Sequence, residues 1–169
     1  MKRHYALAAA TGLAAALTVF PVLAADSLPT ETHKVLTAAL AVEAAEAAIA
    51  HCKAEGYNVS VTIMDRTGVP KLILMGDGAS ELSMEIARRK AYTAAMLKVP
   101  TGDFAKRLQQ PGAFNPGVFD PQLTPAQGGL PIKVGNDTIA AIGASGAPGG
   151  DKDEACAAAG LAKISDRLN

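Results

Sequence analysis

The segment GGLPIKVGNDTIAAIGASGAPGG, residues 128–150, decides the class of fold, because its glycines and its lysine suit either a phosphate-binding loop or a tight β-hairpin. Two apolar runs, residues 130–134 and 138–144, flank the sequence Gly-Asn-Asp at 135–137. Short apolar runs joined by such a sequence are typical of two antiparallel strands and their turn. The segment therefore predicts a hairpin.

The alternative, a nucleotide-binding loop, fails on the positions of the lysine and the glycines. A phosphate loop places its lysine directly before Ser or Thr at the start of a helix, whereas Lys133 lies inside a predicted strand and precedes Val134. A dinucleotide-binding fingerprint needs its glycines between a strand and a helix of a parallel unit. Gly143 and Gly146 do precede a predicted helix, but the strand before them belongs to the hairpin. We interpret these glycines as turn and close-packing residues.

The rest of the chain supplies a second hairpin and several helices. Alternating apolar residues predict strands over 57–65 and 69–75, with Pro70 favouring an edge position for the second strand. Proline-rich residues 110–127 lack periodicity and predict a long irregular loop. The predicted helices are residues 31–55, residues 80–98 with Ser80 as the cap, a short turn up to Leu108, and a last helix that Asp151 and Glu154 begin as a capping box. This order predicts an α+β fold, an antiparallel sheet with helices packed on it.

The first long helix carries two apolar faces. The predicted buried face holds Val35, Ala38, Ala39, Val42, Ala45, Ile49 and Cys52, and the opposite face holds His33, Leu36, Leu40, Ala44, Ala47 and His51. A helix that is apolar on two sides is usually covered on two sides. We therefore expect a second subunit or a ligand to cover the face of Leu36, Leu40, Ala44 and Ala47, and we expect a homo-oligomer.

Residues 1–24 are predicted to be a secretory signal peptide. A short basic start is followed by an uncharged apolar run at 5–20 and by Val22-Leu23-Ala24, which suits signal cleavage. The alternative, a transmembrane anchor, needs about 20 apolar residues and no such exit site. Removal of the peptide leaves residues 25–169, a size typical of one domain, without a membrane span and in the periplasm or outside the cell.

The charge of the mature chain argues against two classes of partner. Loss of Lys2 and Arg3 leaves 14 basic residues against 16 acidic ones, a net charge of −2. No basic field remains that would attract nucleic acid or an anionic membrane. We therefore expect a small-molecule ligand and no nucleic acid.

Cys52 and Cys156 are the two cysteines of the chain. An even number of cysteines in an exported protein favours a disulfide. Two buried free thiols are the alternative.

Four blocks together resemble the haem-binding/haem-degrading family of HbpS-like and GlcG-like proteins and PduO C-terminal domains. They are VTIMDRTGVPKLILMGDGA at 61–79, ARRKAYTAA at 87–95, GGLPI at 128–132 and AAIGASGAPGGDKDEAC at 140–156. The resemblance implies a profilin-like fold, with a central antiparallel sheet of about five strands flanked by helices, and a symmetric homo-oligomer. It also implies reversible binding of haem or of a similar flat, carboxylated ligand.

The resemblance also implies candidate site residues. His33 stands where haem-binding relatives place a histidine, which makes it the candidate axial ligand to the iron; a solvated or interface histidine is the alternative. Arg88, Lys90 and Tyr92 lie in the signature block, and the two cations suit the carboxylates of the ligand, although a solvated charged face is the alternative. Gly128 and Gly129 would let the backbone approach a flat ring. We expect these residues to surround one pocket that the proline-rich loop closes.

The chemistry of an enzyme is not recognisable in the sequence. We find no serine with a recognisable base, no Cys–His pair and no metal-ligand spacing. Whether the protein is an enzyme therefore stays open. An enzyme or accessory subunit acting on a small 2-oxo or 2-hydroxy acid is the alternative function, because relatives lie in such pathways.

Overall fold

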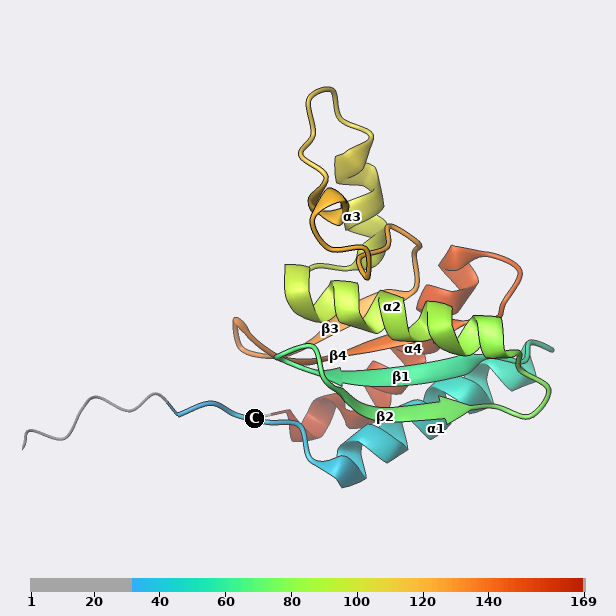
Figure 1. The fold of residues 1–169 in the computed structure, drawn as a ribbon. Helices are drawn as coiled ribbons and strands as arrows, with labels where there is room; N and C mark the ends of the chain where they lie inside the picture. The colour runs from blue at the N-terminus through green and yellow to red at the C-terminus, as the bar shows by residue number, and fades with distance from the viewer. Residues whose placement is uncertain (1–31, 169) are drawn as a thin grey trace, which may run out of the picture. The chain divides into compact units, whose positions relative to one another are not determined.

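The computed structural model describes residues 32–168 of the chain, so the predicted signal peptide lies outside the described residues. Helices and strands follow the predicted order, helix, hairpin, helix, irregular segment, hairpin, helix (Figure 1). The elements are α1 (Ala38–Ala54), β1 (Ser60–Asp65), β2 (Pro70–Met75), α2 (Glu81–Leu97), α3 (Thr101–Leu108), the 3-10 turn η1 (Pro116–Val118), β3 (Gly129–Val134), β4 (Asp137–Ser145), α4 (Gly150–Ile164) and the 3-10 turn η2 (Ser165–Arg167).

The sheet is antiparallel, with strand order β2-β1-β4-β3. Both predicted hairpins are confirmed, β1 with β2 and β3 with β4, and β2 is an edge strand as Pro70 indicated. Within the described residues the sheet has four strands, not the expected five or so. The residue pattern itself indicated two hairpins, and it was the resemblance that suggested a further strand.

Helices cover both faces of the sheet (Figure 1). On one face, α1 and α4 lie side by side and enclose the larger apolar cluster with Val61, Ile63 and Ile142 of the central strands. On the other face, α2 packs its alanines against Met64 and Ala141 in a smaller cluster. A Cβ atom added to Gly143 would lie 2.4 Å from the carbonyl oxygen of Ala87 in α2. The glycine therefore serves close packing of helix on strand, as the sequence predicted.

The start and the orientation of α1 differ from the prediction. The helix begins at Ala38, where the hydroxyl of Thr37 accepts a hydrogen bond from the backbone N–H of Leu40 at 3.3 Å. Leu36 and Ala44 are buried inside this chain, whereas Val35, which was expected in the core, is 67% exposed. Because most residues of this helix are alanines, apolar periodicity cannot distinguish its faces.

We expected a partner or ligand to cover the face of Leu36 and Ala44 because that face was thought to be open. This reason is wrong, since both residues are buried within the chain. The chain's own α4 covers part of that face, since a Cβ atom added to Gly160 would lie 2.4 Å from the carbonyl oxygen of Ala44. Small residues on both helices permit this close approach. The helix pair thus carries no argument for a second subunit.

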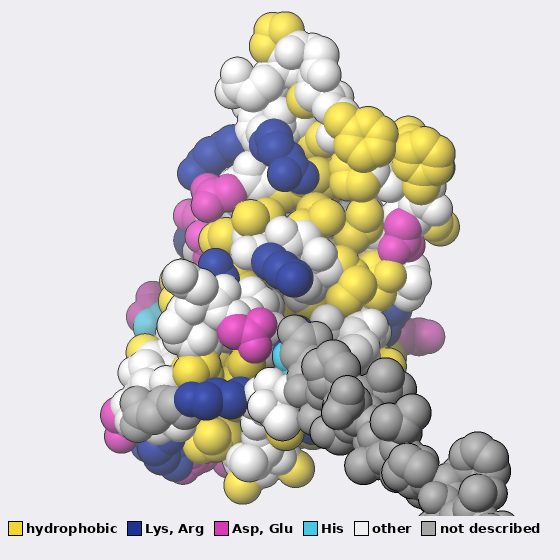
Figure 2. Space-filling model, turned by 90° about the vertical axis from the view of Figure 1, so that its left-hand side faces the viewer, with side chains coloured by type: hydrophobic (Ala, Val, Ile, Leu, Met, Phe, Trp, Pro, Cys, Tyr) yellow, Lys and Arg dark blue, Asp and Glu magenta, His cyan; other side chains and the backbone are white. Residues whose placement is uncertain are grey.

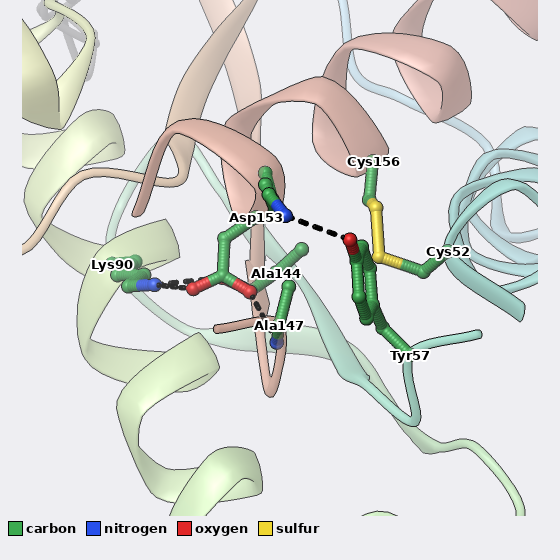
Figure 3. Close-up of a disulfide and its surroundings, with 8 residues drawn as sticks. Cys52, Tyr57, Lys90, Ala144, Ala147, Asp153 and Cys156 are labelled. Atoms are coloured by element: carbon green, nitrogen blue, oxygen red, sulfur yellow. Dashed lines mark hydrogen bonds and ion pairs between the residues drawn. A yellow bond between two sulfur atoms is a disulfide. The ribbon is translucent and has the colours of Figure 1, made fainter. Parts of the chain in front are cut away.

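The disulfide is present between Cys52 in α1 and Cys156 in α4 (Figure 3). The Cα atoms are 5.5 Å apart, which suits a disulfide, and both residues are buried. The bond joins residues 104 positions apart in the sequence. In the loop-entropy account, a closure of that length stabilises the fold by about 4–5 kcal/mol.

None of the described helices is long and apolar enough to cross a membrane.

Candidate ligand-binding site

Lys90 of α2 lies inside the protein with its charge paired. Its Nζ donates to Oδ2 of Asp153 in α4 at 2.6 Å and to the carbonyl oxygen of Ala144 at 3.0 Å (Figure 3). Burial lowers the pKa of Lys90, while the hydrogen bond to Asp153 opposes that shift. The other carboxylate oxygen of Asp153 accepts from the backbone N–H of Ala147 at 2.9 Å. The pair therefore joins the helices of opposite layers and fixes the turn between β4 and α4.

Gly128 and Gly129 lie beside this ion pair, at the start of β3. A Cβ atom added to Gly129 would lie 2.4 Å from the carbonyl oxygen of Lys90, and one added to Gly128 would lie 2.8 Å from Cβ of Asp153. Gly128 also has a φ of +125°, which disfavours other residues. Atoms of Lys90 and Asp153 therefore occupy the space beside these glycines that the sequence analysis assigned to a flat ring.

Arg88 and Tyr92 lie on the outer side of α2, under the irregular loop. The Tyr92 hydroxyl donates to Oδ2 of Asp120 at 2.7 Å, and Arg88 donates to Oε1 of Gln122 at 3.1 Å and to the carboxylate of Glu85 at 2.8 Å. The hydrogen bond to Asp120 raises the pKa of Tyr92, and the hydrogen bond from Tyr92 lowers the pKa of Asp120. Both predicted site residues are thus engaged with the chain's own polar groups.

Further hydrogen bonds attach the loop to α2. Arg89 donates to the carbonyl oxygens of Pro121 and Gln122, and the backbone N–H of Thr124 donates to the Thr93 hydroxyl at 2.9 Å. The loop exposes its apolar side chains, with Phe114, Val118 and Phe119 each at least 67% exposed. Figure 2 shows hydrophobic side chains gathered at the end of the molecule that carries α3 and this loop. The loop therefore covers α2 with polar bonds and presents aromatic rings outward.

His33 lies apart from these residues. It precedes α1 in a non-helical, exposed segment, and α1 covers the face of the sheet opposite to α2 (Figure 1). The structure thus brings Lys90 together with Gly128 and Gly129, and Arg88 together with Tyr92 on the same helix. It does not bring His33 to either group within one protomer. The expected single pocket is divided between the two faces of the sheet.

A hollow of about 280 Å³ adjoins the His33 segment at the N-terminal end of α1. Its apolar wall consists of Val35, Leu40, Val134, Ile139 and Leu168, and Lys34, Thr37 and Arg167 complete the lining. Arg167 donates to the carboxylate of Glu43 and to the carbonyl oxygen of Lys163 at 3.2 Å. The hollow therefore combines an apolar wall with two cationic side chains, next to an imidazole in the sequence.

A second hollow, of about 190 Å³, lies beside the disulfide. His51, Glu55, Tyr57, Lys152, Ala155 and Cys156 line it. The Lys152 ammonium donates to the Tyr57 hydroxyl at 2.8 Å and lies 5.0 Å from the centre of the Tyr57 ring. Three of its six lining residues, His51, Glu55 and Lys152, carry ionisable nitrogen or carboxylate groups, and Ala155 is the one aliphatic residue of this lining. Among residues 32–168, no group of three or more His, Cys, Asp or Glu side chains is arranged to hold a metal ion.

Sequence reasoning missed Asp153, Asp120, Lys34 and Arg167. Asp153 stands in the first turn of α4, where an acidic residue suits the helix dipole and so attracts no notice. The predicted capping box is wrong, because the cap is Gly149 and makes no side-chain hydrogen bond. Asp120 gave a weak signal, an acidic residue within an apolar, proline-rich loop. Lys34 and Arg167 are 133 positions apart in the sequence, and only the fold brings them to one hollow.

Comparison with known proteins gives relatives that share this fold. HbpS of Streptomyces reticuli, solved as a double mutant, is 39% identical, with a TM-score of 0.73 over 85% of this chain and 96% of that chain. The Klebsiella pneumoniae protein ORFY is 28% identical, with a TM-score of 0.73 over 82% and 98%. The PduOC:heme complex is 24% identical, with a TM-score of 0.71 over 78% and 96%, and at that identity the likeness shows the fold alone.

Two further matches concern the sequence. An uncharacterised 15.0 kDa protein from the dhaT-dhaS intergenic region of Citrobacter freundii is 32% identical over 124 residues, which are 69% of this chain and 84% of that protein. The family model described as haem degrading protein HbpS-like matches residues 36–162, most of the described chain. The resemblance seen in the four sequence blocks is therefore confirmed, and the chain belongs to the HbpS-like haem degrading protein family.

Proposed function

We propose that this protein binds haem, or a similar flat, carboxylated ligand, reversibly at the hollow beside α1. The family supports the class of ligand, since a relative of the same fold is described as a haem complex. The observation that carries the position is the combination of an apolar wall with Lys34 and Arg167 at its border. We name this hollow, with the adjacent His33, the α1 hollow.

The residues of the α1 hollow fit the chemical requirements of haem. The macrocycle needs apolar contacts, which five aliphatic side chains of the wall supply. Its two carboxylates need cations, and Lys34 and Arg167 provide charge-assisted hydrogen-bond donors. When bound, the haem iron would accept a histidine nitrogen as a ligand. In our proposal the imidazole of His33, next to Lys34 in the chain, would supply it.

The size of the α1 hollow supports a second part of the proposal. Its volume of about 280 Å³ is slightly below the roughly 300–1,000 Å³ of typical ligand pockets. A macrocycle seated there would keep part of its apolar surface outside the hollow. We propose that a second copy of the chain covers this part, in a homo-oligomer. The predicted export to the periplasm or the medium also stays a proposal, which the disulfide supports.

The other predicted site residues do not contact the ligand in this proposal. Lys90, Gly128 and Gly129 maintain the junction of α2, β3 and α4, where their contacts are already made. Arg88 and Tyr92, with the aromatic loop, form the competing position for the ligand. The α1 hollow is favoured because aliphatic side chains form its wall, whereas Arg88 and Tyr92 attach the loop to α2 through Gln122 and Asp120.

The test is a titration of the mature protein with hemin, followed by absorbance near the Soret band. We expect saturable binding with one ligand per site and a Soret maximum shifted from that of free hemin. Heat-denatured protein at the same concentration is the control for adsorption to apolar surface. A titration that does not saturate, or that is identical for native and denatured protein, contradicts the proposed function.

A further inference from the structure

Arg167 of the α1 hollow is paired with a carboxylate of its own chain. The guanidinium donates to the Glu43 side chain from α1, and this interaction is the main cause that raises the pKa of Arg167. Asp166 lies nearby, with its carboxylate 3.5 Å from Nε of Arg167. One of the two cations that line the hollow therefore already holds the Glu43 carboxylate.

The Glu43–Arg167 pair is accessible to solvent, with exposed side-chain fractions of 39% and 44%. Ion pairs at such positions stabilise a fold only slightly, because water and salt screen the attraction between the charges. A ligand carboxylate presents the same acceptor atoms as Glu43 and has the additional support of the apolar wall. The two carboxylates therefore compete for one guanidinium.

We propose that Glu43 is an internal competitor of the ligand carboxylate: it occupies Arg167 in the empty protein and sets the affinity of the α1 hollow for carboxylated ligands. This inference rests on the proposed function. It adds a residue that decides specificity, because a flat ligand without carboxylates gains nothing from displacing Glu43. It also predicts that loss of an acidic residue tightens binding.

The test measures hemin affinity in Glu43→Gln, which keeps the shape of the side chain and removes its charge. We expect binding about two- to fivefold tighter than in the wild type, the factor that follows from removing a competing surface ion pair. Hemin dimethyl ester, which keeps the iron and the ring but has no free carboxylate, should bind both proteins equally. The Arg167→Gln variant should bind hemin more weakly, and in that background Glu43→Gln should have no further effect.

Glu55→Gln is the matched control. It removes the same charge at the C-cap of the same helix, about 18 Å along the helix axis from Glu43 at about 1.5 Å per residue. We expect unchanged hemin affinity, which separates competition from a general change of charge. Circular dichroism of each variant checks that α1 is intact.

The outcomes separate the inference from the proposed function. Saturable hemin binding that is unchanged or weaker in Glu43→Gln overturns the inference and leaves the proposed function standing. An equal gain for hemin and its dimethyl ester, or an equal gain in Glu55→Gln, also overturns it. No saturable binding of hemin by the wild type removes the proposed function, and the inference with it.

Discussion

The two faces of the sheet are covered by different kinds of contact. On one face, α1 and α4 pack through aliphatic side chains, alanines and a disulfide. On the other, α2 rests on a smaller apolar cluster, and the loop above it is attached by hydrogen bonds to Arg88, Arg89, Tyr92 and Thr93.

This difference explains why we assign the ligand to the α1 face. The apolar packing of α1 ends in a hollow whose aliphatic wall is accessible and whose cations stand at its border. The polar groups of the α2 face are already bonded to its own loop. Sequence motifs drew attention to α2, but the fold places an apolar hollow with cations at its border beside α1.

Loss of the ion pair that joins the two faces should give the largest effect. In Lys90→Met, Asp153 stays buried without its cation, and breaking a buried pair in this way costs about 3–5 kcal/mol. We expect the free energy of unfolding, measured by urea denaturation with circular dichroism, to fall by that amount. Lys133→Met, at an exposed position in β3, is the control, with an expected change within about 0.5 kcal/mol. Equal stability of the two variants would show that the Lys90–Asp153 pair does not hold the layers together.

Removal of the disulfide should destabilise the α1 face by a comparable amount. The double variant Cys52→Ala/Cys156→Ala gives the unfolded chain back the freedom of a long loop, and we expect a loss of about 2–5 kcal/mol. The same urea experiment measures it. A reductant should destabilise the wild type by a similar amount and leave the double variant unchanged. If a reductant affects both proteins equally, the loss does not come from this bond.

The attachment of the loop to α2 should be weaker than either of these links. Tyr92→Phe removes the hydroxyl that donates to Asp120, one of the hydrogen bonds that attach the loop to α2. We expect limited proteolysis within residues 109–127 to become about fivefold faster, because cleavage follows the population of the opened loop. Tyr57→Phe removes a hydroxyl that accepts from Lys152 of α4, and it should leave cleavage unchanged. A midpoint of global unfolding that falls as in Lys90→Met would contradict a merely local role for Tyr92.

The pH dependence of the loop attachment follows from the same hydrogen bond. Because the pKa of Tyr92 is raised above its ordinary value of 10.0 in the folded state, its contribution to stability is complete below pH 10 and is lost as the pH rises through the raised pKa. Absorbance at 295 nm should show one tyrosine that ionises later than in unfolded protein. Asp120→Asn removes the main cause of the shift, so this late step should move toward pH 10. A late step that persists in Asp120→Asn assigns it to another cause.

Much of the fold could be predicted, because it depends on local patterns. Alternation indicated the first hairpin, and two apolar runs around Gly-Asn-Asp at 135–137 indicated the second. Pro70 indicated the edge strand, and the Ser80 hydroxyl caps α2 as expected, accepting from the Ser83 N–H at 3.1 Å. The buried face of α1 could not be predicted, because alanines lie on most sides of this helix and the apolar pattern does not single out one face. Its start was also placed too early, at residue 31 and not at Ala38.

The candidate site was less accessible to prediction, because it depends on contacts between distant segments. No local sequence pattern reveals that Lys90 reaches Asp153, 63 positions later. Lys90 therefore cannot be recognised from the sequence as a buried cation. Nor does the sequence show that the sheet separates His33 from Arg88 and Tyr92. The expected pocket is divided because α1 and α2 pack on opposite faces of the sheet (Figure 1).

The most direct test of the central claim compares His33→Ala with Tyr92→Phe in hemin titrations. Loss of a group that only orients a metal ligand already costs about 10–100-fold in affinity. We therefore expect His33→Ala, which removes the proposed ligand itself, to weaken hemin binding at least about tenfold and to shift or abolish the Soret maximum. Tyr92→Phe should keep both the affinity and the spectrum of the wild type. An unchanged spectrum in folded His33→Ala, together with loss of binding in Tyr92→Phe, would contradict our account and place the ligand on the α2 face.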